Sequence, residues 1–236
     1  MDQIEIRNLS FSYPGAKKKC LEDVSFSIEK GEYVLLCGNS GCGKTTLLRH
    51  LKSVLTPTGD RAGEIFFNGC PMDRVDSGTQ AASIGYVMQN PDEQIVTDKV
   101  WHELAFGLEN LGEDPGTIGL RVAEMASFFG IQSWYHRDVS QLSGGQKQLL
   151  NLASIMAMQP EILILDEPTG QLDPIAASDF LNTLKKINRE LGTTVLITEH
   201  RAEDIFPVAD RVLVMEHGRL TGNAAPREIG RGMFET

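Results

Sequence analysis

The 236-residue sequence has no long hydrophobic run. Its longest unbroken apolar stretches, such as residues 33–37 and 162–165, fall far below the ~20 residues that a helix needs to cross a bilayer. The N-terminal residues also lack the basic and apolar regions of a signal peptide, which argues against export. From these absences we expect no membrane-spanning helix and no secretion.

Cysteine and positive charge are both scarce. The four cysteines form no CxxC pair and have no histidine at a ligand-like spacing, so we interpret them as reduced thiols of a cytosolic protein. There are 22 Lys and Arg against 32 Asp and Glu, a net charge of −10, and the basic run at residues 17–19 is short. Because such a charge repels phosphate backbones and anionic headgroups, the composition argues against nucleic-acid and membrane-surface binding.

The composition is otherwise that of an ordinary globular domain. Hydrophobic residues make up 41% of the chain and charged residues 23%, unlike disordered, collagen-like or disulfide-rich sequences. The length is about one and a half times that of a typical domain of roughly 150 residues. We therefore expect one domain, residues 1–236, that carries a subdomain.

The hydrophobic pattern changes along the chain. β-Forming residues fill 3–38, and from about residue 146 helices and strands alternate, which predicts a parallel sheet covered by helices. The apolar strand sequences are typical of strands buried on both faces. The expected helices are 47–55, a polar helical stretch at 98–140 with breaks at Gly112 and at Pro115-Gly116, 146–158, 176–191 and 202–206. The expected later strands are 64–67, 84–88, 162–165, 194–198 and 211–215.

A glycine-rich loop lies between the strand expected at 33–37 and the following helix. Its glycines let backbone N–H groups turn inward around phosphate oxygens. In that arrangement Lys44 reaches the β- and γ-phosphates and Thr45 binds Mg²⁺; the alternative is an ordinary glycine-rich turn. The loop and the residues after it that we expect to contact a nucleotide are Asn39, Ser40, Gly41, Cys42, Gly43, Lys44, Thr45 and Thr46.

An acidic pair, Asp166 and Glu167, ends the apolar strand at 162–165. Carboxyl ends of parallel strands are where α/β sheets bind ligands, so we assign Asp166 to the Mg²⁺ shell and Glu167 to the general base that activates water. A solvated acidic turn is the alternative. Together with the loop, the pair predicts an α/β fold: a P-loop NTPase core with a parallel sheet, an N-terminal antiparallel β portion and an inserted helical subdomain.

Residues 142–146 read Leu-Ser-Gly-Gly-Gln and open a helix. With this string the sequence resembles the ATP-binding-cassette (ABC) ATPase family over nearly its whole length, in the family's motif order. The resemblance implies a core at 1–89 and 161–221, a helical subdomain at 90–160 and a tail at 222–236. It also implies that ATP and Mg²⁺ are the ligands. The residues it assigns are Tyr13 to adenine, Gln89 to Mg²⁺ and catalysis, His200 to the γ-phosphate, and Ser143, Gly145, Gln146 and Asp173 to a shared nucleotide site.

In this family, the segment at 142–146 of one cassette caps the ATP held by the phosphate loop of another. The resemblance therefore implies a second cassette as partner, closing head to tail on ATP and released by hydrolysis. Because Glu167 and His200 are both present, we expect an active ATPase. Gly170-Gln171 replaces the commoner Ser-Ala before Leu172-Asp173, which bears on communication between the two sites.

Two further stretches, 89–94 (QNPDEQ) and 105–110 (AFGLEN), resemble the ATPase components of energy-coupling-factor importers. That resemblance implies import of a vitamin or transition-metal ion through a separate integral membrane subunit. The subunit would contact residues 89–110 at the cytoplasmic face of the cell membrane. The alternatives are another ABC importer or exporter ATPase and, opposed by the acidic charge, a cassette acting on nucleic acid or ribosomes.

The sequence departs from separate energy-coupling-factor ATPases in two ways. The C-terminal extension usual in those proteins is missing, and Glu199 stands between Thr198 and His200, where Thr-His is commoner. Both departures resemble one cassette of a tandem double-cassette protein, which predicts weak dimerisation of the isolated domain. We also expect Cys42, beside Lys44, to be a reactive thiolate protected by ATP, with a small space-filling role as the alternative.

Overall fold

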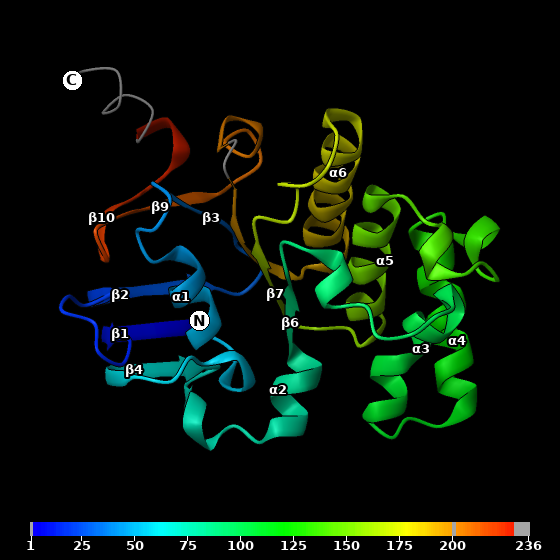
Figure 1. The fold of residues 1–236 in the computed structure, drawn as a ribbon, viewed down its shortest axis with the longest axis horizontal. Coiled ribbons are helices and arrows are strands. Elements are labelled where there is room, and N and C mark those ends of the chain that lie inside the picture. Colours follow the sequence, from blue (N-terminus) through cyan, green and yellow to red (C-terminus); the bar gives the residue numbers. More distant parts are fainter. Residues whose placement is uncertain (1, 200–201, 229–236) are drawn as a thin grey trace.

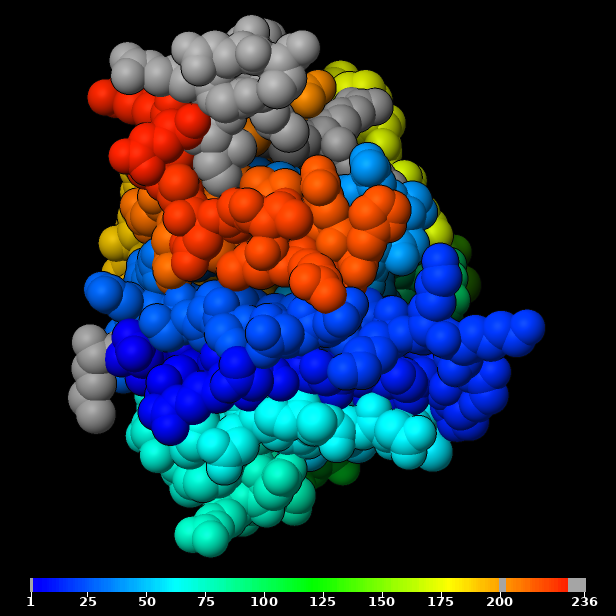
Figure 2. Space-filling view, turned by 90° about the vertical axis from the view of Figure 1, so that its left-hand side faces the viewer, coloured from blue at the N-terminus to red at the C-terminus, as the bar shows by residue number. Residues whose placement is uncertain are grey.

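The computed structural model describes residues 2–199 and 202–228. Its N-terminal part is a four-stranded antiparallel sheet in the order β2-β1-β4-β5. Figure 2 shows this sheet as a blue and cyan band, with β9 and β10 in orange above it. The antiparallel β portion expected from the sequence is thereby confirmed. Its strands are β1 (Asp2–Ser12), β2 (Leu21–Glu29), β4 (Asp60–Phe67) and β5 (Cys70–Pro71).

A six-stranded sheet in the order β10-β9-β3-β8-β7-β6 forms the centre of the molecule (Figure 1). All neighbouring strands are parallel except β9 and β10. Strands β7 and β8 are buried throughout, as their apolar sequences predict. The strands are β3 (Tyr33–Gly38), β6 (Ile84–Val87), β7 (Ile162–Asp166), β8 (Thr194–Thr198), β9 (Arg211–Glu216) and β10 (Arg219–Ala224).

Two hydrophobic cores lie on opposite faces of the six-stranded sheet. Successive residues of a strand point to opposite faces, so Tyr33 and Leu35 join one core and Val34 and Leu36 the other. The first core includes residues of α3, α4, α5 and α6, whereas the second includes residues of α1 and the antiparallel sheet. The helices are α1 (Lys44–His50), α2 (Ser77–Ser83), α3 (Val100–Asn110), α4 (Pro115–Phe128), α5 (Gly144–Ala157) and α6 (Pro174–Leu191).

Helices α3 and α4 form the end of the molecule opposite the antiparallel sheet, with α5 between them and the central strands (Figure 1). They correspond to the helical stretch expected at 98–140, and the chain breaks between them at Gly112, which has a φ of 77°. None of the helices in the described part of the chain has the length and hydrophobicity that a bilayer crossing requires.

Some elements differ from those expected. The helix expected at 47–55 is α1 followed by a 3-10 turn over Ser53–Leu55, and the short helix at 202–206 is a 3-10 turn over Ala202–Asp204. Helix α2 is not predicted by the sequence pattern, because its residues carry no apolar stripe. Its start is fixed by a cap, in which Asp76 accepts from the Thr79 N–H at 2.9 Å. Strand β10 reaches Ala224 and so passes the expected start of the tail at residue 222.

Candidate nucleotide-binding and hydrolysis site

The loop from β3 to α1 is closely packed around two glycines with left-handed or near-extended backbone. Gly38 has a φ of 149°, and a Cβ there would lie 2.1 Å from the Met215 carbonyl oxygen. Gly43 has a φ of 109°, and a Cβ there would lie 2.8 Å from the Cys20 carbonyl oxygen. Neither position has room for a side chain, so the tight path of the loop depends on glycine.

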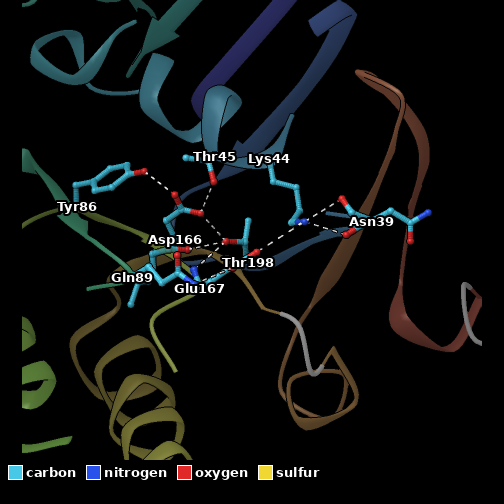
Figure 3. Close-up of polar contacts among 10 residues, drawn as sticks. Asn39, Lys44, Thr45, Tyr86, Gln89, Asp166, Glu167 and Thr198 are labelled. Carbon is cyan, nitrogen blue, oxygen red and sulfur yellow. Dashed lines mark hydrogen bonds and ion pairs between the residues drawn. The ribbon is translucent and has the colours of Figure 1, made fainter. Parts of the chain in front are cut away.

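The Lys44 ammonium group is held beside this loop. Its Nζ donates to the carbonyl oxygens of Gly38 at 2.9 Å and Asn39 at 3.3 Å (Figure 3). The same atom lies 3.8 Å from Glu167 Oε1, in an ion pair whose side chains are 5% and 14% exposed. A nearly buried cation at the mouth of a glycine loop is the arrangement that binds phosphate oxygens.

The Asp166 carboxylate accepts hydrogen bonds from hydroxyl groups at the carboxyl edge of the central sheet (Figure 3). Its Oδ1 accepts from Thr45 Oγ1 at 3.0 Å and from Thr198 Oγ1 at 3.1 Å, and its Oδ2 accepts from the Tyr86 hydroxyl at 3.3 Å. Asp166 and Thr198 are register partners of the parallel strands β7 and β8. Burial, with the Asp166 charge, raises the pKa of Tyr86, so this hydroxyl keeps its proton and donates.

Glu167 directly follows β7 in a left-handed backbone conformation, with a φ of 49°. Its N–H donates to the Thr198 carbonyl oxygen at 3.1 Å and Thr198 Oγ1 at 3.0 Å, and its Oε2 accepts from Gln89 Nε2 at 3.3 Å. A positive φ in a non-glycine residue is uncommon and is concentrated at functional sites. The turn aims the Glu167 carboxylate at Lys44 and Gln89.

The hydroxyl of Thr45 and the carboxylate of Asp166 fit an Mg²⁺ ion. Both line a cavity of about 420 Å³ together with Gln89. Mg²⁺ prefers oxygen ligands and is usually held by one or two protein groups, with substrate phosphates and water completing its shell. Among the described residues, no group of three or more His, Cys, Asp and Glu is gathered to hold a metal by itself. The predicted metal residues thus offer the donor set of a nucleotide-associated Mg²⁺.

The phosphate loop borders a second cavity of about 330 Å³, and several predicted residues meet there. Tyr13 lies next to this loop, because its hydroxyl and Thr46 Oγ1 form a hydrogen bond of 3.0 Å. The Tyr13 ring is 39% exposed and packs edge-on against Phe11. A partly exposed aromatic ring next to the phosphate loop is the kind of group that stacks on a base. The residues lining the cavity are Cys20, Ser40, Gly41, Gly43, Lys44, Thr45, Thr46 and Glu167.

The expectation of a reactive Cys42 thiol is wrong in this structure. The side chain is 6% exposed and belongs to the core beneath the antiparallel sheet. It fills space against Gly38, where an added Cβ would lie 2.9 Å from its Sγ. The cysteine that lines the phosphate cavity is Cys20, which is half-buried and donates from Sγ to Thr46 Oγ1 at 3.3 Å.

The residues assigned to the shared site lie elsewhere in the chain. Ser143 caps α5, since its Oγ accepts from the Gln146 N–H at 3.3 Å while Gln146 Oε1 accepts from the Ser143 N–H at 2.9 Å. With Gly145 they line a separate cavity of about 230 Å³. Asp173 caps α6 by accepting from two backbone N–H groups. The structure therefore brings none of these four into the phosphate cavity of their own chain, and His200 lies outside the described residues.

The sequence does not predict that Tyr86 and Thr198 contact the acidic pair. Both hydroxyls bond Asp166, and Thr198 also accepts from the Glu167 N–H. Both lie on strands of the central sheet, next to β7, which ends at the acidic pair. A polar residue ending an apolar strand is the available signal, and Thr198 has it. Glu199, next along the chain, is 5% exposed and accepts from the Thr169 N–H at 2.9 Å, so it supports the loop after Glu167.

The chain belongs to the ABC transporter family of ATP-binding cassettes, since a family profile described as ABC transporter matches residues 21–170. An ABC transporter ATP-binding protein of Bacillus cereus is 49% identical over 231 residues, 98% of this chain and 42% of that protein. One from Methanosarcina acetivorans is 36% identical over 226 residues, 96% of this chain and 68% of that protein. The chain thus spans less than half the length of the Bacillus protein.

Solved structures agree with this assignment. The structure of cbiO1 from Clostridium perfringens, described as part of the ABC transporter complex cbiONQ, matches with a TM-score of 0.88 and 30% identity. The match covers 98% of this chain and 92% of that one. The resemblance to the ABC family of ATP-binding cassettes and the P-loop α/β fold are both confirmed, and the family hydrolyses ATP.

Proposed function

We propose that this chain binds ATP with Mg²⁺ and hydrolyses it to ADP and phosphate. The convergence of Lys44, Glu167 and Gln89 beside the Thr45–Asp166 pair supports this most directly. Lys44 exchanges its contacts to loop carbonyls for contacts to phosphate oxygens, and Tyr13 stacks on adenine.

Proton transfer falls to Glu167. Its carboxylate accepts a proton from the attacking water. Gln89, whose Nε2 lies 3.3 Å from Glu167 Oε2, orients the carboxylate and the water. Thr45 and Asp166 would hold Mg²⁺, which, when bound, neutralises charge that develops on the phosphate oxygens. His200 completes the site as a γ-phosphate contact.

Hydrolysis requires a second cassette in this proposal. Ser143, Gly145 and Gln146 open α5 away from the phosphate cavity of their own chain, and a helix N-terminus favours an anion. A second chain or tandem cassette presents this segment to the ATP, and Asp173 lies at the same junction. Because the γ-phosphate contacts exist only before hydrolysis, ATP closes the pair and phosphate loss opens it.

The ATPase is proposed to power import of a vitamin or transition-metal ion through a separate membrane subunit. Residues 89–110 form the contact region, where apolar Val96, Trp101 and Phe106 are 62%, 41% and 38% exposed. The 30% identity to cbiO1 supports this class. The cassette then sits peripherally at the cytoplasmic face of the membrane, and no nucleic acid is expected as partner.

The hydrolysis step is tested with Glu167→Gln. We expect loss of ATP hydrolysis by about 100-fold or more, since a general base contributes about 10²–10⁴-fold, while ATP affinity stays at the wild-type level. Glu190→Gln, which changes an exposed carboxylate on α6, serves as the control and should keep full activity. Equal turnover in wild type and Glu167→Gln would remove Glu167 from the mechanism.

The transport step is tested by affinity capture from native membranes with Glu167→Gln and ATP. We expect co-purification of an integral membrane protein, and its bound solute identifies the import class. The variant Trp101→Glu, made in the proposed contact region, should lose that protein. Capture of ribosomes or nucleic acid in its place would favour the alternative in which the cassette acts on those partners.

A further inference from the structure

Gln148 is a fully buried amide on α5, just after the segment at 142–146. Its Nε2 donates to two backbone carbonyl oxygens, those of Met88 and Pro168, each at 3.0 Å. Met88 directly precedes Gln89, and Pro168 directly follows Glu167. One side chain therefore holds the backbone on both sides of the Gln89–Glu167 contact.

The two backbone segments have no strand pairing at this point. The pairing of β6 with β7 ends at Val87 and Leu165, one residue before Met88 on β6 and three before Pro168 on β7. Beyond that pair, the Gln148 amide donates to a carbonyl oxygen in each of the two segments, so it connects them where strand pairing has ended. The side-chain contact it brackets, from Gln89 Nε2 to Glu167 Oε2, measures 3.3 Å.

Neighbouring residues of α5 hold one of the two segments but do not contact the other in the same way. Lys147 Nζ contacts Asp92 Oδ1 at 2.6 Å, and Asn151 Nδ2 donates to the Pro91 carbonyl oxygen at 3.5 Å. Both bonds fasten residues 91–92 to the helix. Gln148 differs from both residues because it makes a second bond, to the Pro168 carbonyl oxygen in the segment that contains Glu167.

The amide is also incompletely satisfied. Gln148 Oε1 is buried and has no hydrogen-bond partner. Burying an acceptor without a donor is unfavourable, so a side chain that only filled this space would be apolar. The two donated bonds are the physical reason for an amide at this position.

We propose that Gln148 is a positioning residue for ATP hydrolysis: it fixes the distance between Gln89 and Glu167 and ties that distance to the start of α5. The inference rests on the proposed hydrolysis. When Ser143, five residues earlier, meets the nucleotide of a second cassette, any shift of the helix start moves the Gln148 amide. The spacing of the catalytic pair then depends on whether the second cassette is engaged.

The test uses Gln148→Met, which keeps the volume and removes both donors, and Gln148→Asn, which keeps the amide but is too short to span both carbonyls. Asn151→Leu is the matched control. It removes a buried amide of the same helix that also bonds the segment after β6, but it leaves the bond from Gln148 to Pro168 in place. We expect kcat to fall by about tenfold to a hundredfold in both Gln148 variants, as catalytic misplacement does. KM for ATP should stay unchanged, and Asn151→Leu should keep kcat within about threefold of wild type.

Hydrogen exchange on the nucleotide-free proteins supplies a readout that does not need turnover. Gln148→Met should speed exchange in both 88–92 and 166–170, whereas Asn151→Leu should speed it only in the first. If wild type binds ATP without hydrolysing it, the hydrolysis proposal is wrong. The exchange pattern then decides whether Gln148 holds the two segments together. A kcat equal to that of Asn151→Leu, or faster exchange in only one segment, overturns the positioning role.

Discussion

Asp166 is oriented by three hydroxyl groups, and each belongs to a different element. Thr45 comes from α1, Tyr86 from β6 and Thr198 from β8. A carboxylate held from three sides keeps one orientation before a ligand arrives, which is what a preorganised site requires. The bond from Thr45 also joins α1, which follows the phosphate loop, to the end of β7, so it links the two halves of the site.

Lys52 carries a residue-scale prediction on stability. Its Nζ donates to the Ile84 carbonyl oxygen, and burial lowers its pKa from the usual 10.5 to about 8. Between pH 8 and 10.5 the folded state has lost this proton while the unfolded state still binds it, so the free energy of unfolding rises with pH across that window. The rise is at most about 3 kcal/mol, at 1.36 kcal/mol for each pH unit.

The measurement is urea denaturation of wild type and Lys52→Met at several pH values from 7.5 to about 10.5. Buried Tyr33 and Tyr86, whose pKa values are raised, titrate alike in both proteins, so the difference between the two curves isolates Lys52. We expect that difference to grow in favour of wild type as the pH rises. If the free energies of unfolding of the two proteins change in parallel with pH, the lowered pKa of Lys52 is contradicted.

At the scale of elements, the central strands were the most predictable part of the sequence. Residues 195–197 and 162–165 are apolar without interruption, and such runs are typical of strands buried on both faces. The loop at 38–45 and the acidic pair were also readable, because their chemistry depends on residue type at fixed spacing. The phosphate cavity brings together residues from both motifs.

The contacts of Gln148, Tyr86 and Thr198 were not predictable in the same way. Each depends on which elements lie side by side in the fold. Thr198, for example, meets Asp166 only through the register of β7 and β8. The burial of Cys42 depends on the packing of the antiparallel sheet, which its neighbour Lys44 does not reveal. Short α2 lacks an apolar stripe, so periodicity could not find it.

Asp173 is a residue with two proposed roles: it caps the start of α6, and it belongs to the proposed shared nucleotide site. It caps α6 by accepting from the N–H groups of Ile175 and Ala176, each at 3.0 Å. We expect Asp173→Ala to lower the free energy of unfolding by about 1 kcal/mol, and Asp173→Asn to leave it nearly unchanged, since Asn caps as well as Asp. Denaturant unfolding measures both.

Activity separates the two roles of Asp173. If its carboxylate also contacts a second cassette, Asp173→Asn should keep wild-type stability and still lower ATP turnover. Unchanged stability in Asp173→Ala would show that α6 does not depend on this cap.

At the scale of the whole molecule, the site divides between two places. The phosphate cavity is bordered by residues from the β1–β2 connection, the phosphate loop, α1 and the end of β7, whereas Ser143, Gly145 and Gln146 line another cavity between α5 and α6. In the proposed function, a second cassette brings these two places together at one nucleotide.

Sedimentation velocity of Glu167→Gln with MgATP, with MgADP and without nucleotide tests this shared site most directly. We predict a dimer with MgATP and a monomer in the other two conditions, because the γ-phosphate is the group that both cassettes contact. Adding Ser143→Arg should keep the protein monomeric with MgATP while ATP still binds. The same species in all three conditions would contradict a site closed by a second cassette.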